Sequence, residues 1–281
     1  MKYREIKPKA PLVGFVECFW TLEDSEGNGT NHDPEPILPD GCVELILNFG
    51  ERFREHRDDG NQVYQPTNML VGQMTRPTLI APTGMVSLVG IRFQPGGTLP
   101  FFRLAMHEIT DKIIELGAFA GTLERDLVAC VAEADRLNEK VTAIESLLIE
   151  RVRNCKHDSW LNRLAAAVVQ QGGCITVDTI ASTAGVSARH LQRRFLQDVG
   201  IGPKLFCRVL RFQQVFRAVE RDKSGWASVA HDCGYYDQAH LIRDFQQFAG
   251  QPPAFLFSHL DPLTESFTRK NRKSDFSNTM S

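Results

Sequence analysis

The sequence predicts an α+β fold, in which a mixed, mainly β N-terminal domain ending in a helix pair precedes an all-α domain. Three observations predict this fold class. Short runs rich in β-branched and aromatic residues, separated by turn residues, fill the first 120 positions. A helical period takes over at Gly121. Residues 160–260 are helical in pattern almost throughout, and this region contains an internal repeat.

The N-terminal apolar runs are expected to form strands. The clearest are VECFWTLE at 16–23, CVELILNF at 42–49 and MVSLVGIRF at 85–93. Between the first two, LPDG at 38–41 has the composition of a tight turn. We therefore assign residues 39–41 a structural role rather than contact with a ligand.

An antiparallel helix pair is expected at 121–153, because apolar residues recur at helical spacing on both sides of a break near Asp135. This apolar stripe has two possible roles: it forms a dimer interface, or it packs onto the rest of its own domain. The stripe consists of Leu123, Leu127, Val131, Val141, Ile144, Leu148 and Val152.

Domain boundaries follow from these changes of pattern. We expect a sensor-like or partner domain at 1–153, an all-α domain at 159–260 and a disordered tail at 261–281. Charge is divided in the same way. Residues 1–158 carry 17 Lys and Arg against 24 Asp and Glu, whereas residues 159–260 carry 11 against 7. A polyanionic partner is therefore expected to meet the C-terminal third.

The composition favours a cytoplasmic protein without a membrane span, a metal or a cofactor. The longest aliphatic run, 164–169, is far shorter than the roughly 18 residues that a span needs, and the N-terminus lacks a signal-type apolar core. Seven scattered cysteines contain no C-x-x-C pair, so neither a disulfide framework nor a zinc ribbon is expected. His32, His56 and His107 are too dispersed for the ligand set of a metal-binding β-barrel.

A repeat of about fifty residues is the most informative feature of the sequence. TIASTAGVSARHLQRRFLQDVGIGP at 179–203 recurs loosely as SVAHDCGYYDQAHLIRDFQQFAGQPP at 228–253. Each copy combines a short helix, a corner glycine and a second helix that begins after Ser187 or Asp237, which are good N-cap residues. The repeat predicts two helix-turn-helix units.

A long helix is expected to join the two units. Pro203 suits the first position of this helix, which extends to about Arg221 and would be about 28 Å long at 1.5 Å per residue. Major-groove faces on one side of a duplex are about 34 Å apart, so the helix can hold two reading helices about one DNA turn apart.

These residues resemble the AraC/XylS family of bacterial transcriptional regulators, whose DNA-binding domain is two helix-turn-helix units joined by a long helix. The resemblance covers about residues 160–260 and includes FCRVLRFQQVFRAVE between the two units. The front of the chain is similar to a sensor-like domain of uncharacterised role that precedes such domains, on the basis of LPDGCVELILNFG, VGQMTRP and GIRFQPGG.

The resemblance implies which side chains contact DNA. The first recognition helix corresponds to 187–197 and the second to 237–248. Arginine can bind guanine, and glutamine adenine, with two hydrogen bonds each. In the second unit, Ala239 stands where the first unit has Arg189, and Asp237 and Asp244 flank the face that would meet DNA. We therefore expect the first unit to discriminate more strongly between DNA sequences. The expected contacts are Ser187, Arg189, Gln192, Arg193, Gln238, Ala239, His240 and Arg243.

Three basic residues of the joining helix, Lys204, Arg208 and Arg211, are spaced by four and three positions. This spacing places them on one side of the helix, where they can contact phosphates. The alternative is a solvated surface that contributes only to solubility.

The functional expectation is a regulator that binds double-stranded DNA, associates with the nucleoid and is not an enzyme. A small-molecule effector or partner would act at the N-terminal domain, through ligand residues that the sequence does not identify, and RNA polymerase would be a partner of an activator. One alternative is an enzyme with the same DNA-binding module, such as an alkyl-repair protein, although Cys18 and Cys42 lack partners at zinc-ligand spacing. Another makes the N-terminal domain a structural dimerisation module that forms a homodimer.

Overall fold

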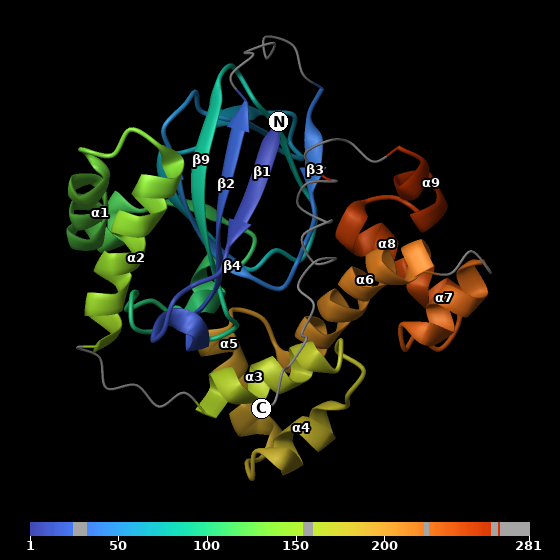
Figure 1. Ribbon diagram of the computed structural model, residues 1–281. Coiled ribbons are helices and arrows are strands. Elements are labelled where there is room, and N and C mark those ends of the chain that lie inside the picture. The colour runs from blue at the N-terminus through green and yellow to red at the C-terminus, as the bar shows by residue number, and fades with distance from the viewer. Residues whose placement is uncertain (25–32, 154–159, 222–224, 260–263, 265–281) are drawn as a thin grey trace.

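The computed structural model describes residues 1–24, 33–153, 160–221 and 225–259, together with Thr264. Strands occupy the N-terminal part and helices the C-terminal part (Figure 1), which confirms the expected α+β fold class. The polar joint at 154–159 and the tail from residue 261 lie outside the described residues, Thr264 excepted. Among the described helices, none combines the length and the apolar character that a membrane span requires.

The three predicted strands lie together in the larger sheet. They are β2 (Val16–Asp24), β9 (Val86–Phe93) and β4 (Val43–Asn48), which pair in that order and antiparallel. The outer strands β1, β7 and β10 complete the order β1-β2-β9-β4-β7-β10. Their bounds are Lys2–Ile6, Asn68–Val71 and Ile113–Glu115.

A smaller second sheet, absent from the sequence prediction, has the order β3-β8-β5-β6. Its strands are three or four residues long, at Glu35–Ile37, Thr78–Ala81, Arg54–His56 and Gln62–Tyr64. Two 3₁₀ turns, η1 (Leu12–Gly14) and η2 (Met106–Ile109), lie in the connections.

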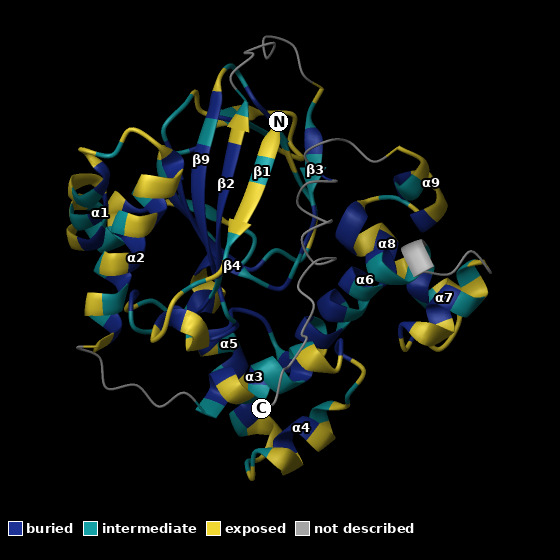
Figure 2. Cartoon of the chain, viewed as in Figure 1, coloured by how far each residue is buried: buried dark blue, intermediate teal, exposed yellow. Residues whose placement is uncertain are grey.

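The larger sheet is covered on both faces, so its central strands β4 and β9 are buried at every position but Ser87 (Figure 2). Alternate residues of β9, such as Val89 and Ile91, join one core cluster with α1 and α2. Leu88 and the intervening positions face the smaller sheet and form a second cluster with Trp20 and Phe53. The N-terminal part thus has three layers: helices, large sheet and small sheet.

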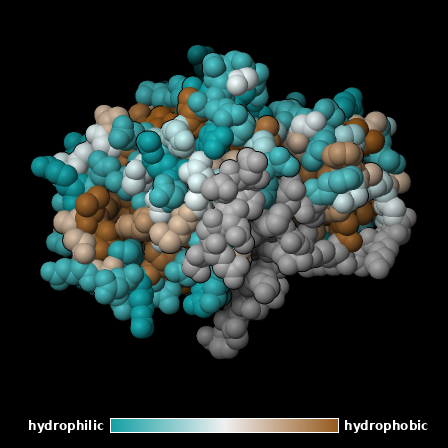
Figure 3. Space-filling model, turned by 90° about the horizontal axis from the view of Figure 1, so that it is seen from above, coloured by the Kyte–Doolittle hydropathy of each residue, from teal (hydrophilic) through white to brown (hydrophobic). Residues whose placement is uncertain are grey.

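The predicted helix pair corresponds to α1 (Gly117–Val131) and α2 (Leu137–Arg153). All seven residues of its apolar stripe are buried in the core with the larger sheet, so the pair packs onto its own sheet and the stripe offers no dimer surface. Seen from above, hydrophobic side chains reach the surface on the side of α1 and α2, on the side of α7 to α9 and at places between them (Figure 3).

Within the described residues 160–221 and 225–259, the C-terminal part contains seven helices. They are α3 (Trp160–Gln170), α4 (Val177–Thr183), α5 (Ala188–Asp198), α6 (Pro203–Arg221), α7 (Trp226–Asp232), α8 (Gln238–Ala249) and α9 (Pro253–Ser258). The long α6 runs from the first helix pair, α4 and α5, to the second, α7 and α8 (Figure 1). This is the predicted arrangement of two helix-turn-helix units on one joining helix.

Both units turn at the corner glycines that the repeat predicts. Gly185 has φ 64° and Gly234 has φ 73°, a left-handed conformation that residues with a side chain rarely adopt. Each second helix then begins at its predicted cap, because Ser187 accepts a hydrogen bond from the His190 amide and Asp237 accepts one from the His240 amide.

The N-terminal part contributes a side chain to the core of the C-terminal helices. Leu38, from the turn before β4, belongs to the hydrophobic cluster of the C-terminal helices and is 5% exposed. Next to it, the Gln213 amide of α6 donates a hydrogen bond to the Pro39 carbonyl. Leu38 and Pro39 of the LPDG turn therefore have a structural role, because they join the two parts.

Candidate functional site

The first recognition helix, α5, presents its predicted base-reading residues to solvent. Arg189, Gln192 and Arg193 are exposed, while Leu191 and Phe195 on the opposite side are fully buried. Ser187 caps the helix. The structure therefore brings two guanidinium groups and one amide together on a free helical face, as major-groove readout requires.

The second recognition helix, α8, has a different surface. Gln238, Ala239 and Arg243 are exposed, and His240 is half-buried with its ring edge-on to Tyr235. The expectation that Asp244 flanks this face is wrong, because Asp244 is 1% exposed and points into the domain. The exposed face of α8 therefore carries the guanidinium group of Arg243, and the carboxylate of Asp244 does not lie next to it.

Asp244 is buried because it pairs with Arg208 of α6. The Arg208 Nη2 lies 2.7 Å from the Asp244 Oδ1, and the same nitrogen donates to the Gln247 side chain. Arg211 donates to the Gly173 carbonyl. These contacts favour a structural role for both arginines over phosphate contact, whereas Lys204 at the start of α6 is exposed.

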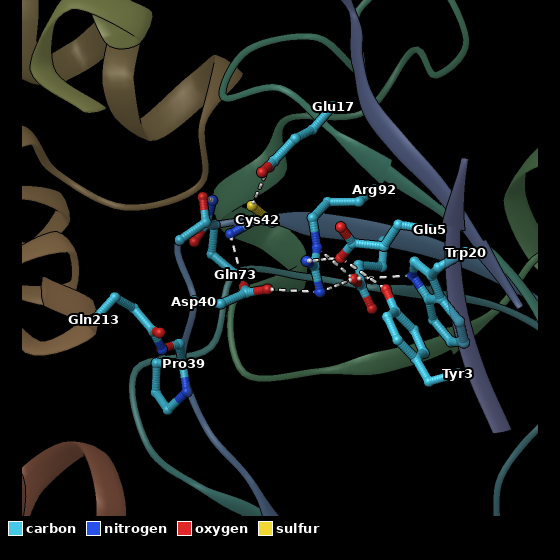
Figure 4. Close-up of polar contacts among 12 residues, drawn as sticks. Tyr3, Glu5, Glu17, Trp20, Pro39, Asp40, Cys42, Gln73, Arg92 and Gln213 are labelled. Atoms are coloured by element: carbon cyan, nitrogen blue, oxygen red, sulfur yellow. Dashed lines mark hydrogen bonds and ion pairs between the residues drawn. The ribbon is translucent and has the colours of Figure 1, made fainter. Parts of the chain in front are cut away.

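A buried polar cluster lies between the two sheets of the N-terminal part (Figure 4). Glu44 and Arg92 are a cross-strand pair of β4 and β9, and the Glu44 Oε1 accepts hydrogen bonds from Arg92 Nε at 2.8 Å and from Trp20 Nε1 at 3.2 Å. Arg92 Nη2 also lies 3.2 Å from the Asp40 Oδ2. Burial alone would lower the pKa of Arg92, but Glu44 and Asp40 more than offset this, so Arg92 stays charged.

The negative charge of Asp40 is less well compensated by Arg92 than that of Glu44. Burial raises the pKa of Asp40 to about 6, against the lowering effect of Arg92 and of the hydrogen bond from the Cys42 amide. Burial, with Asp40 and Glu17 close by, also raises the pKa of the Cys42 thiol well above its usual value. A thiol held in its protonated form is a poor nucleophile.

A cavity of about 70 Å³ extends from this cluster between the sheets. Its walls are mostly apolar, with Trp20, Phe53 and Ile80 among them. A second cavity, of about 270 Å³, lies between the N-terminal part and the helices α3 and α6. Asp40, Cys42 and Gln213 line both cavities and form the wall between them.

Comparison with known proteins follows the same division of the chain. Residues 4–115 match a family described as a domain of unknown function (DUF6597), and residues 180–259 match a family described as a helix-turn-helix domain. A Streptomyces lividans protein named as an AraC-like transcription regulator is 33% identical over 109 residues. The chain carries an AraC-type helix-turn-helix domain. The match covers 36% of this chain and 36% of that relative's own length.

Two solved structures align along most of the chain at low similarity. ToxT from Vibrio cholerae is 10% identical, covers 85% of this chain and 97% of its own, and has a TM-score of 0.44. The AraC-like transcriptional activator CuxR is 11% identical, covers 83% of this chain and 90% of its own, and has a TM-score of 0.25. No function follows from scores in this range.

The AraC-type domain is held against the N-terminal part at several points. The Thr110 hydroxyl after η2 donates to the Gly200 carbonyl at the end of α5, at 2.7 Å. The side chain of Asn162 in α3 donates to the Gly14 carbonyl, at 3.2 Å. Gln73 contacts Gly200 from one side and donates to the Gly41 carbonyl, at 2.7 Å. Both recognition helices thus belong to a domain whose position depends on the N-terminal part.

Sequence reasoning missed the buried cluster of Asp40, Glu44 and Arg92, although a signal was present. Glu44 interrupts the apolar run of β4, and Arg92 interrupts that of β9. A charged residue in a mainly apolar, buried strand is expected to have a buried partner. Within the described part of the chain, no three His, Cys, Asp or Glu side chains are grouped so that they could hold a metal ion.

Proposed function

We propose that this protein is a sequence-specific DNA-binding transcription regulator whose AraC-type domain reads the major groove with α5 and, to a lesser extent, with α8. The observation that carries the proposal is the exposed face of Arg189, Gln192 and Arg193 on a capped recognition helix inside a repeated helix-turn-helix domain. Arginine and glutamine are the side chains that bind guanine and adenine edges with two hydrogen bonds.

The unequal faces of the two helices support unequal roles. The face of α5 offers two guanidinium groups and an amide, whereas α8 offers Arg243 with Gln238 and the small Ala239. In this proposal α5 supplies most of the base discrimination. Lys204, exposed at the start of α6, contacts a phosphate, while Arg208 and Arg211 hold the domain together.

The second element of the proposal is control by an effector in the N-terminal part, with residues 1–153 and 159–260 acting as two domains. It is supported by the wall of Asp40, Cys42 and Gln213, because Gln213 belongs to α6, which carries both units. A molecule that moves this wall acts directly on the joining helix. An activator of this kind would also contact RNA polymerase.

Selection of DNA sites from a random pool by the full-length protein tests the first element. We expect Arg193→Ala to relax preference at one or two base pairs, since loss of a bidentate base contact costs about 1–3 kcal/mol at that position. Arg243→Ala is expected to weaken binding to all sequences more evenly. Arg125→Ala, an exposed arginine of α1, is the matched control and should change neither.

Two results would contradict the proposal. The first is the absence of any enriched site at low salt, together with binding that does not depend on salt, because phosphate contacts release counterions. The second concerns the division of roles. If Arg243→Ala scrambles the selected sequence while Arg193→Ala preserves it, base reading resides in α8.

A further inference from the structure

The cavity between the two sheets contains an excess of negative charge. Of the described residues that line it, the charged ones are Asp40, Glu44 and Arg92, which leave a net charge of −1 when all are ionised. We propose that this cavity binds a small apolar molecule that carries one protonated nitrogen, such as a primary amine. The inference rests on the proposed control by an effector and names the class of that effector.

The arrangement of hydrogen bonds leaves acceptors for such a nitrogen. All three contacts of the Glu44 carboxylate, two from Arg92 and one from Trp20, end on its Oε1. Its Oε2 accepts no hydrogen bond from any described residue, although Glu44 is only 9% exposed. A carboxylate that lines a cavity with one oxygen unused is suited to a donor from a ligand.

Asp40 provides the second acceptor and the reason for a positive charge. Among the described residues its cationic partner is Arg92, which is already bonded to Glu44 at the shorter distance of 2.7 Å, against 3.2 Å to Asp40. Burial raises the pKa of Asp40 even though Arg92 acts to lower it, and Glu44 raises it further. An ammonium group supplies a positive charge, whereas a carboxylate would add a third acid to the cavity.

The remainder of the cavity fits an apolar body. The side chains of Phe53, Met69, Ile80 and Leu88 line it, and they are buried or nearly so. Gln65 also lines it, is 5% exposed, and makes no side-chain hydrogen bond to any described residue. Its amide can bind a further polar atom of the ligand, so the site is apolar with polar groups at defined points, as ligand pockets commonly are.

The size of the cavity limits the ligand. Its 70 Å³ is below the roughly 150 Å³ of an apolar cavity known to hold benzene, so a molecule of five or more carbon atoms has to displace part of the wall. Asp40, Cys42 and Gln213 are that wall on the side of the 270 Å³ cavity. Binding of an amine at Asp40 therefore acts on the hydrogen bond between Gln213 and Pro39.

Calorimetric titration of the full-length protein with pentylamine, pentan-1-ol and pentanoate at pH 8 tests the inference, because the three probes share one chain length and differ in charge. We expect pentylamine to bind at least about tenfold more tightly than pentan-1-ol, a ratio typical of one charge-assisted hydrogen bond, and pentanoate to bind most weakly. Equal or tighter binding of pentanoate, or no binding of pentylamine, would overturn the inference.

Three variants test whether pentylamine binds in this cavity. Asp40→Asn should weaken pentylamine binding about tenfold and leave the alcohol unchanged, because the amide keeps the hydrogen bond with the Cys42 amide but loses the charge. Asp58→Asn, at an exposed aspartate of the same part, is the matched control and should bind all probes normally. Val71→Phe, which fills the cavity, should abolish binding of every probe. Unchanged amine affinity in Asp40→Asn would place the amine elsewhere and overturn the inference.

Failure of this inference differs from failure of the proposed function, since DNA binding is measured separately on the same protein. If pentylamine does not bind but a DNA site is selected, the ligand class is wrong and the regulator stands. If pentylamine binds as described and no DNA site is selected at any amine concentration, the ligand class stands and the regulator fails.

Discussion

Asp40 is a buried aspartate whose surroundings disfavour its charged form. Burial raises the pKa of Asp40 to about 6, whereas an unfolded aspartate titrates near 3.9. The folded protein therefore binds the proton more tightly than the unfolded chain. By linkage, this residue contributes stability below pH 4 that is lost as the pH rises from about 4 to about 6.

Replacement of Asp40 by asparagine removes this loss. We expect Asp40→Asn to raise the free energy of unfolding at pH 7 by about 2–3 kcal/mol, which is what a pKa shift of about two units represents, because the asparagine side chain carries no charge to bury. Urea unfolding at several pH values measures the difference, which should vanish below pH 4. A variant less stable than the wild type at pH 7 would show that the Arg92 contact dominates.

Arg208 is a basic residue of the helix-turn-helix domain that stabilises the interior by pairing with a buried acid. Its partner Asp244 has a side chain 1% exposed, so Arg208→Ala leaves a buried carboxylate without its cation. We expect the free energy of unfolding to fall by about 2–4 kcal/mol. Lys204→Ala, one turn earlier on α6, should change stability by less than about 0.5 kcal/mol.

The two variants also separate the roles in DNA binding. Lys204→Ala should weaken binding to all sequences and reduce the dependence of affinity on salt. Addition of Asp244→Asn to Arg208→Ala should restore part of the lost stability, because the unpaired charge is removed. If Arg208→Ala unfolds like the wild type and loses DNA affinity, Arg208 is a phosphate contact after all.

At the scale of elements, the pairing of β2 with β9 depends on a glycine. Trp20 and Gly90 are directly opposed, and a Cβ at residue 90 would lie 1.9 Å from the Trp20 ring. Gly90→Ala forces this ring to move, at a cost of about 1–3 kcal/mol. Near-ultraviolet circular dichroism should record the displaced tryptophan, and urea unfolding the lower stability.

Gly121→Ala is the matched control for that substitution. Gly121 lies in α1, and a Cβ there would have no heavy atom within 4 Å. Alanine inside a helix is more stable than glycine by about 0.5–1 kcal/mol, so this variant should be slightly stabilised. Opposite signs for the two variants are the expected result, and a neutral Gly90→Ala would mean that Trp20 has room to move.

An element could be predicted from the sequence when its apolar pattern was long enough to show a period. The strands β2, β4 and β9 and the helices α5, α6 and α8 have long apolar patterns or strong caps, and they were predicted. The four strands of the second sheet are three or four residues long, too short for a periodic signal, so they were missed. Glu44 and Arg92 were not recognised as a pair, because the register of two strands forty residues apart cannot be read from either strand.

The exposure of side chains on the first recognition helix could be predicted from the helical period. The positions of Arg189, Gln192 and Arg193 follow from the helical period and from the buried Leu191 and Phe195. The inward direction of Asp244 does not, since it depends on Arg208 of another helix. Contacts between elements therefore set the limit of the sequence prediction.

At the scale of the whole molecule, Leu38 ties the N-terminal part to the core of the C-terminal helices. Leu38→Ala leaves a cavity in that core, and we expect the free energy of unfolding to fall by about 2–4 kcal/mol. Leu79→Ala, at a leucine that is 40% exposed, should cost less than about 1 kcal/mol.

Calorimetry of these two variants also measures cooperativity. The wild type and Leu79→Ala should unfold in one transition, since Leu38 of the N-terminal part is buried in the core of the C-terminal helices. In Leu38→Ala the transition should broaden or divide. If Leu38→Ala unfolds as sharply as the wild type with unchanged stability, the contact between the parts contributes nothing to folding.

The position of Leu38 also limits how far this protein can be treated as modular in protein engineering. A chimera that joins residues 160–259 to a foreign sensor leaves Phe206 and Leu210, which pack near Gly41, without the turn that covers them. Such a chimera would expose apolar side chains of α6 and tend to aggregate. A functional transplant of the DNA-binding half would have to include the short LPDG segment, or a substitute of the same shape, although it lies more than a hundred residues away in the chain.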